Sequence, residues 1–245
     1  MTEVCAIVSG KGGVGKSMTA FTLAGVLSGG NNRALVIDFN LGLRGLDILY
    51  KCEQNVVYDL GDVLDGKCAS YHDALFRYSK NPNLYGIAAP SNPFYHLTFD
   101  SLYTLMDGLK KDFNYIFLDA PASISGGFVS AMALCDRAII LTTPDPLSVS
   151  GATKIGQYIT NSDTDTAHVL INGVNFQSKR APIIGNFDSI IDSIGFPLIG
   201  VLPFNPRLYD EVMKGQLPKT KDDYMKAVYN IARRFNGEMV PLLFG

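Results

Sequence analysis

Residues 4–17 read Val-Cys-Ala-Ile-Val-Ser-Gly-Lys-Gly-Gly-Val-Gly-Lys-Ser, and this stretch decides the fold. The apolar run Val4–Ser9 is typical of a buried parallel strand. It leads into the spacing Gly10-x-x-x-x-Gly15-Lys16-Ser17 and then into a helical pattern. Glycines let backbone N–H groups converge on phosphate oxygens, and the N-terminus of the following helix adds its positive end. The stretch therefore predicts a phosphate-binding loop, or P-loop, between a strand and a helix.

Each residue type in this loop has an expected part in holding ATP and Mg²⁺. We expect Lys16 to reach the outer phosphates as a point charge and the Ser17 hydroxyl to ligate Mg²⁺. The alternative is a glycine-rich turn without a ligand, which the strand–loop–helix setting disfavours. The predicted nucleotide-binding residues of the loop are Gly10, Lys11, Gly12, Gly13, Val14, Gly15, Lys16, Ser17 and Met18.

Two carboxylates close other apolar runs. Leu35-Val36-Ile37 ends in Asp38, and Tyr115-Ile116-Phe117-Leu118 ends in Asp119. Ligands of open α/β sheets bind at the carboxyl ends of the strands, which is where these side chains are expected. Asp38 and Asp119 are therefore predicted, with Ser17, to hold Mg²⁺. For each Asp, capping of the next helix is the alternative.

Short apolar runs alternate with helical patterns along the whole chain, which predicts an α/β fold. Such alternation favours one doubly wound, mostly parallel sheet with helices on both faces, over residues 1–245 as a single domain. The segment 39–85 is the least regular part. The predicted strands are Val4–Ser9, Ala34–Asp38, Leu84–Ala89, Tyr115–Asp119, Ala138–Thr142, His168–Ile171 and Leu198–Leu202. The predicted helices are Gly15–Ser28, Phe99–Lys111, Phe128–Leu134, Ser148–Thr160, Ile183–Ile194, Pro206–Lys214 and Asp222–Phe235.

Composition excludes several classes of protein. Hydrophobic residues make up 47% and charged residues 18% of the chain, which indicates a globular rather than a disordered protein. The net charge of −2 gives no overall attraction to nucleic acid or to an anionic membrane. The four cysteines form no CxxC pair, so neither a disulfide nor a cysteine metal site is expected. With no basic n-region and no apolar run of about 20 residues, we expect a cytoplasmic protein.

A second lysine, Lys11, follows the first glycine of the loop. Residues 9–17 thereby resemble the deviant Walker A motif of the MinD/ParA family of ATPases. Residues 36–47, Val-Ile-Asp-Phe-Asn-Leu-Gly-Leu-Arg-Gly-Leu-Asp, resemble switch I of the MinD branch, and residues 57–59 fit the same branch. Residues 119–122 resemble switch II, and residues 143–145 resemble the strand-end Pro-acid element. Segments 171–172 and 200–203 resemble the adenine site, which adds Asn172 and Pro203 to the expected nucleotide-binding residues.

The resemblance implies a P-loop ATPase whose two subunits enclose two ATP molecules face to face. Lys11 would reach across to the phosphates of the other subunit, as an arginine finger does. A homodimer that forms on ATP binding and a regulatory protein partner are therefore expected. The cellular role would be spatial regulation, of the cell division site, a flagellum or a chromosome. The implied catalytic residues are Lys11, Lys16, Asp38, Asn40 and Asp119.

Four positions depart from the family pattern. Asn40 stands where MinD-like chains carry an acid, and a neutral amide can orient a water but cannot take a proton. We therefore expect slow Mg²⁺-dependent ATP hydrolysis. Ser123 replaces a glycine of switch II. Ser150 and Gly151 replace an arginine and an acid, which leaves Asp145 as the candidate partner of Lys11 at rest.

The last residues differ from a membrane-binding helix. After the predicted helix 222–235, the apolar tail 236–245 contains Gly237 and Pro241, and no lysine follows Arg234. Packing of the tail on its own or a partner's surface is favoured over a membrane anchor. Peripheral attachment to the inner face of the cell membrane stays open.

Two other functions are weighed against the ATP-dependent switch. The first is a nucleotide-binding scaffold with little hydrolysis, which Asn40 leaves open as an alternative. A P-loop ligase that transfers phosphate to a small carboxylate is disfavoured, because no second substrate motif is evident. Nucleic-acid binding is not expected, since the basic clusters around Lys179-Arg180 and Lys214–Lys221 are modest.

Overall fold

One sheet of eight strands, in the order β3-β4-β2-β5-β1-β6-β7-β8, forms the centre of the molecule. The computed structural model describes residues 2–162, 164, 166–176, 187–214, 216–217 and 222–242. The strands are β1 Glu3–Val8, β2 Ala34–Asp38, β3 Phe76–Arg77, β4 Leu84–Ile87, β5 Tyr115–Asp119, β6 Arg137–Thr142, β7 Thr166–Val174 and β8 Leu198–Pro203. Neighbouring strands pair in parallel except β3, which runs antiparallel to β4 at one edge.

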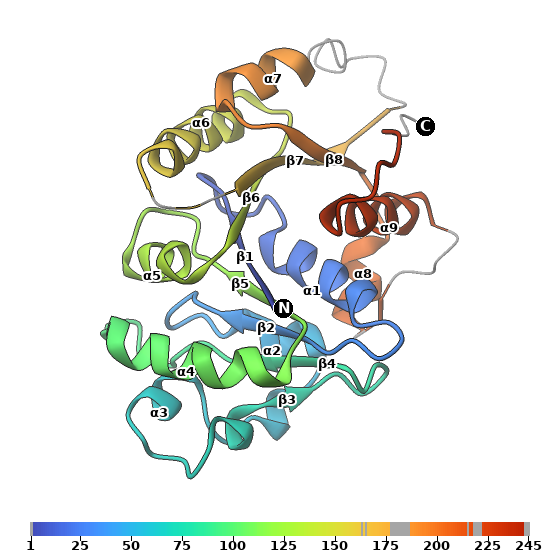
Figure 1. Ribbon diagram of the computed structural model, residues 1–245. Helices are drawn as coiled ribbons and strands as arrows, with labels where there is room; N and C mark the ends of the chain where they lie inside the picture. Colours follow the sequence, from blue (N-terminus) through green and yellow to red (C-terminus); the bar gives the residue numbers. More distant parts are fainter. Residues whose placement is uncertain are drawn as a thin grey trace.

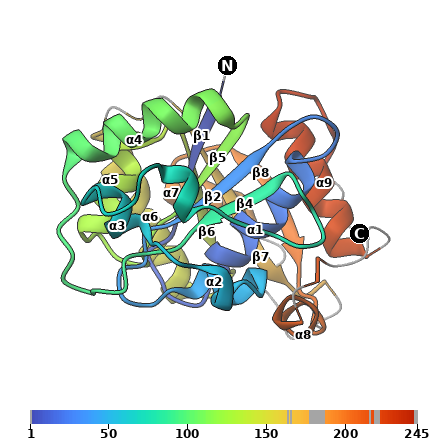
Figure 2. The same ribbon diagram turned by 90° about the horizontal axis from the view of Figure 1, so that it is seen from below.

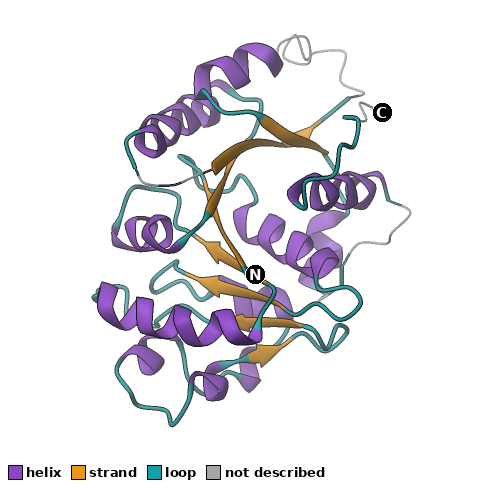
Figure 3. Cartoon of the chain, in the orientation of Figure 1, coloured by secondary structure: helices purple, strands orange, loops and turns teal. Residues whose placement is uncertain are grey.

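Helices cover both faces of this sheet (Figures 1 and 3). They are α1 Lys16–Leu27, α2 Gly45–Tyr50, α3 Leu60–Leu64, α4 Phe99–Asp112, α5 Gly126–Leu134, α6 Pro146–Thr160, α7 Phe187–Ile194, α8 Leu208–Met213 and α9 Asp223–Phe235, with 3-10 turns at Glu53–Asn55 and Tyr71–Ala74. Helices α4 to α7 lie on one face, and α1, α8 and α9 lie on the other, as Figure 1 shows.

The alternation of side chains along each strand explains the two layers. In β1, Val4, Ala6 and Val8 belong to the core under α4 to α7, whereas Cys5 and Ile7 belong to the core under α1 and α9. Both sets are buried, so the strand reads as apolar throughout, as a central parallel strand does. The sequence prediction of a doubly wound, mostly parallel α/β sheet is confirmed.

The carboxyl ends of the parallel strands meet at one edge of the sheet, and the P-loop follows β1 there. The register shows this alignment, since Asp38 of β2 pairs with Asp119 of β5. Figure 2 turns the molecule so that the neighbouring strands β2, β4 and β5 and the helix α1 are seen from below. Side chains at these strand ends can therefore act on one ligand.

Segment 39–85 is more regular than expected. It contains α2, α3, two 3-10 turns and β3, all too short to give a periodic signal in the sequence. Elsewhere the predicted elements are present with ends that differ by at most three residues, and the strands Ala34–Asp38 and Tyr115–Asp119 keep their predicted bounds. Of the predicted helix Ile183–Ile194, residues 183–186 lie outside the described part, and α7 covers the rest. The predicted strand Leu84–Ala89 ends at Ile87, and the carbonyl of the next residue, Ala88, accepts the backbone N–H of Leu60 in α3.

The C-terminal part packs back on the sheet as a strap. Asp222 caps α9 by accepting the backbone N–H of Tyr224. The Arg234 guanidinium then donates to the carbonyls of Val240 and Pro241 and to that of Ile199 in β8, at 2.6–2.9 Å. The part of the tail that is described is thereby fastened to the chain's own body. In the described residues, no helix has the length and apolar character needed to cross a membrane.

Candidate nucleotide site

The P-loop adopts backbone angles that its glycines make accessible. Gly13 and Gly15 have φ of +76° and +99°, in the left-handed region where a side chain is strained. Gly15 also has no room for one, because a Cβ there would lie 2.6 Å from Nδ2 of Asn172. That amide of Asn172 donates to the carbonyl of Val14 at 2.8 Å. The loop is thus shaped by its glycines and tied to the end of β7.

Lys16 lies inside the loop, with only 8% of its surface exposed. Its ammonium donates to the Ser9 hydroxyl at 2.9 Å, and Ser9 in turn donates to the carbonyl of Lys11. Burial lowers the pKa of Lys16, an effect that the charge of Asp119 partly offsets. A buried cation without its own carboxylate bond is costly, so an anionic ligand beside it would be bound strongly.

The two strand-end carboxylates lie next to each other and next to Ser17. The Ser17 hydroxyl donates to Asp119 at 2.5 Å. Burial, followed by the charge of Asp38, raises the pKa of Asp119 to about 7. Burial also raises the pKa of Asp38, against the hydrogen bonds from Asn40. Both pKa shifts have the same main cause, which is the free-energy cost of a negative charge on a buried side chain. Asp119 is exposed by 0% and Asp38 by 1%.

The residues present fit a magnesium ion. Among the described residues, Oδ1 of Asp119 is buried and accepts no hydrogen bond, although the other oxygen of that carboxylate has partners. Hydroxyl and carboxylate oxygens are the ligands that Mg²⁺ prefers. Asp38 differs, because its Oδ2 accepts the backbone N–H of Leu46 in the first turn of α2. The capping alternative therefore holds in part for Asp38, whereas α5 receives no cap from Asp119.

Lys11 lies on the outer side of the loop. Its ammonium forms an ion pair of 2.9 Å with Asp145, and the side chains of both residues are 40% exposed. Although burial acts to raise it, hydrogen bonds from Thr143 and Lys11 bring the pKa of Asp145 down to about 2. Asp145 was the expected partner, and the structure confirms it. Nearby, the backbones of Gly10 and Gly151 lie so close together that a Cβ on Gly10 would meet Gly151 at 2.2 Å and a Cβ on Gly151 would meet the Gly10 oxygen at 2.8 Å.

A groove of about 910 Å³ opens beside the P-loop. Its lining includes Gly12, Lys16 and Ser17 of the P-loop, Asn40, residues 121–123 and residues 93–96. The rim carries two strongly exposed apolar side chains, Leu43 at 76% and Phe94 at 91%. The pocket thus extends from the phosphate loop toward the end of β4.

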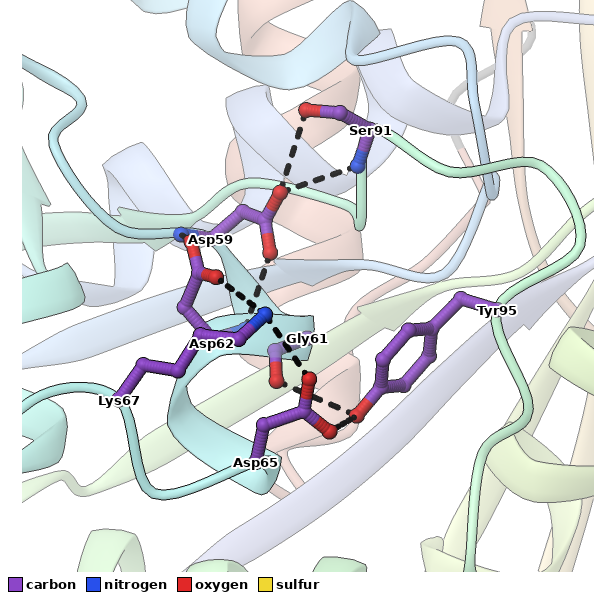
Figure 4. A network of polar contacts seen from close by, with 7 residues as sticks. All are labelled: Asp59, Gly61, Asp62, Asp65, Lys67, Ser91 and Tyr95. Carbon is purple, nitrogen blue, oxygen red and sulfur yellow. Dashed lines mark hydrogen bonds and ion pairs between the residues drawn. The ribbon is translucent and has the colours of Figure 1, made fainter.

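The loop after β4 is held by a network of polar contacts below it (Figure 4). The Tyr95 hydroxyl donates to Asp65 at 2.6 Å, and Lys67 bridges Asp65 to Asp62. Asp59 accepts both the backbone N–H and the hydroxyl of Ser91. This far wall of the groove is therefore fixed by α3.

The structure brings the predicted site residues to one edge of the sheet, where they fall into two groups on either side of β1. Gly12, Gly13, Gly15, Lys16, Ser17, Met18 and Asn40 line the groove, while Asp38 and Asp119 lie buried beside it. Asn172 and Pro203 lie at the ends of β7 and β8, on the opposite side of the P-loop. Sequence reasoning missed Ser9, Gly151 and the loop 91–96. The position of that loop directly after a parallel strand was the signal that could have found it.

Comparison with known proteins identifies this arrangement. The family model of the CobQ/CobB/MinD/ParA nucleotide binding domain matches residues 5–218. The chain belongs to the MinD/ParA family. Septum site-determining protein MinD of Synechocystis is 32% identical over 99% of this chain and 92% of its own length. MinD of Bacillus subtilis is 30% identical over 99% of this chain and 92% of its own length.

Solved structures of the MinD/ParA family agree with the fold. The MinC:MinD cell division protein complex of Aquifex aeolicus superposes with a TM-score of 0.88 at 29% identity, over 99% of this chain and 98% of that chain. MinD of Pyrococcus horikoshii, solved with Mg-ADP, gives a TM-score of 0.82 over 96% of each chain. At 24% identity this second likeness shows the fold alone.

Proposed function

We propose that this chain is an ATP-dependent dimerisation switch of the MinD type, acting in the spatial regulation of cell division. Three features support the proposal: the P-loop, the paired strand-end carboxylates and the second lysine of the loop. The relatives named septum site-determining protein MinD support the cellular role. The complex of a MinD relative with MinC supports a regulatory protein partner.

The orientation of Lys11 is the observation that carries the switch. Lys16 already occupies the interior of the loop, whereas the side chain of Lys11 is 40% exposed and pairs with Asp145, which is exposed to the same extent. An exposed ion pair is worth about 0–1 kcal/mol, so little is lost when Lys11 leaves it. Lys11 is therefore available to the phosphates of a second subunit. Two such loops would repel until phosphate neutralises them, which makes the dimer depend on nucleotide.

Each side chain then has a defined part. The backbone of residues 10–17 and the ammonium of Lys16 bind the phosphates, and Asn172 and Pro203 lie on the side of the loop where the base would rest. Ser17 and Asp119, with Asp38 beside them, would hold Mg²⁺. A bound Mg²⁺ ion would supply neutralisation of charge on the phosphate oxygens. The whole chain acts as one nucleotide-binding domain.

One observation favours a second candidate, a nucleotide-binding scaffold with little hydrolysis. Asn40 lines the groove, but its amide nitrogen is engaged with Asp38 and Asp119 and carries no acidic group. Because an amide cannot accept a proton, Asn40 cannot act as a general base, and ATP hydrolysis is expected to be slow. Asn40→Asp is expected to raise turnover if the role of the family's acid transfers to this position.

Light scattering beside an assay of phosphate release separates the two functions. The switch predicts that ATP with Mg²⁺ doubles the mass and that ADP does not. The scaffold predicts ATP binding without turnover. A chain that binds ATP and stays monomeric at high concentration would contradict the switch.

A further inference from the structure

The amide of Asn40 occupies the space between the two strand-end carboxylates. Its Nδ2 donates to Oδ1 of Asp38 at 2.7 Å and to Oδ2 of Asp119 at 3.1 Å. The carbonyl of Asp119 lies 3.2 Å from the same nitrogen. All three neighbours are acceptors, which fixes the amide with its nitrogen, not its oxygen, toward the carboxylates.

This contact is special to the residue at position 40. An amide N–H is the donor that a pair of adjacent carboxylates lacks, and it places partial positive charge where a cation would otherwise do so. The backbone N–H of Asn40 adds a further bond to Asp38 at 2.8 Å. An acid at position 40 would instead bring a third carboxylate to within hydrogen-bond distance of the first two. Its oxygens would repel them unless a cation lay between.

We propose that Asn40 makes magnesium binding conditional on nucleotide, because in the nucleotide-free chain its amide bonds to both Asp38 and Asp119 and occupies the space between them that a bare cation would need. The inference rests on the proposed magnesium site. Mg²⁺ gives up its water reluctantly and needs strong oxygen ligands. With Asn40 in place, Asp119 and Ser17 do not provide enough oxygen ligands for Mg²⁺ by themselves. The phosphate oxygens of a bound nucleotide would supply the missing ligands. Asn40 is in this sense a positioning residue that determines the order of ligand binding.

Thermal melts without nucleotide test the inference directly. At about pH 8, about 10 mM MgCl₂ is expected to raise the Tm of the wild type by less than about 1 °C. Asn40→Ala removes the side-chain amide donors without adding charge, so its shift is expected to be larger. Asn40→Asp provides three carboxylates and is expected to shift by roughly 5 °C, from a lower starting Tm. Binding of Mn²⁺, followed by electron paramagnetic resonance, should give the same order of affinities.

Two controls accompany these variants. Asn31→Asp makes the same charge change on an exposed turn and should leave the Mg²⁺ response unchanged. Replacing MgCl₂ by sodium chloride at equal ionic strength shows whether the change in Tm comes from general charge screening instead of Mg²⁺ binding. A wild type that binds Mn²⁺ alone as tightly as Asn40→Ala does overturns the inference, even if Asn40→Asp fails to fold. The Tm of the wild type with ATP and Mg²⁺ is measured separately. The absence of a rise in that Tm would contradict the proposed function and not this inference.

Discussion

The centre of the nucleotide site and its outer margin hold their charged side chains in opposite ways. In the centre, Lys16, Asp38 and Asp119 are exposed by 8%, 1% and 0%. At the margin, Lys11 and Asp145 each expose 40% of the side chain. Buried charge destabilises a fold unless something compensates it, whereas an exposed pair costs and contributes little. The difference indicates that the buried charges of the centre are compensated when a charged ligand binds. The exposed ion pair at the margin can break and form again at little cost.

The largest effect is expected from removing the central cation. Lys16→Ala should weaken ATP binding by about 100-fold, because a phosphate charge loses its nearest buried donor. The rise of Tm with ATP and Mg²⁺ measures this, and most of it should disappear. Lys11→Ala is the matched control in the same loop and should keep the rise. An equal loss in both variants would break the comparison between centre and margin.

The next effect concerns assembly and not binding. Lys11→Ala should weaken the ATP-dependent dimer by at least about tenfold, since the cation for the second subunit's phosphates is gone. Light scattering across a concentration series checks this. Lys11→Arg should restore little, because a planar guanidinium fits a tight loop poorly. A Lys11→Ala chain that still doubles its mass with ATP would remove the function proposed for the margin.

Removing one central carboxylate should stabilise the nucleotide-free chain. A carboxyl whose folded-state pKa is raised from 3.8 to about 7 favours the folded state while protonated, so stability falls as the pH rises between these values. Asp119→Asn should therefore raise the Tm by roughly 5 °C at about pH 8 and hardly at all at about pH 4. Asp145→Asn should show no such gain, because the pKa of Asp145 is lowered to about 2. A pH-independent effect of Asp119→Asn would contradict the account of the centre.

The smallest change in Tm is expected in the C-terminal tail, a third region beside the centre and the margin of the site. Arg234→Ala should lower the Tm by roughly 3 °C, since the guanidinium donates to three carbonyls. Arg233→Ala is the matched control, because Arg233 lies on the same helix and forms an exposed ion pair with Glu238. Equal effects of the two substitutions would show that the strap contributes nothing.

The same strap bears on attachment to membranes. With the described tail fastened by Arg234, co-sedimentation with anionic vesicles should be weak even in ATP. Deleting residues 239–245 should change it little. Strong ATP-dependent binding that the deletion abolishes would restore the membrane anchor.

Much of the fold and part of the site followed from sequence because both depend on local pattern. An apolar run before Gly10 fixes β1, and the glycine spacing with Lys16 and Ser17 has one well-understood use. Helix α2 and strand β3 escaped prediction because six and two residues give no periodicity. The end of β4 and the groove wall at Tyr95 escaped because no motif marks them.

The sequence by itself determined that a phosphate loop follows a buried strand, that two strands end in aspartate, and that the loop carries a second lysine. Only the tertiary structure decided what these groups do to one another. Parallel pairing of β2 with β5 set Asp38 beside Asp119, and the turn after β2 brought the Asn40 amide between them. Burial at that point turned two ordinary carboxylates into a costly pair, because the interior solvates charge far less well than water does.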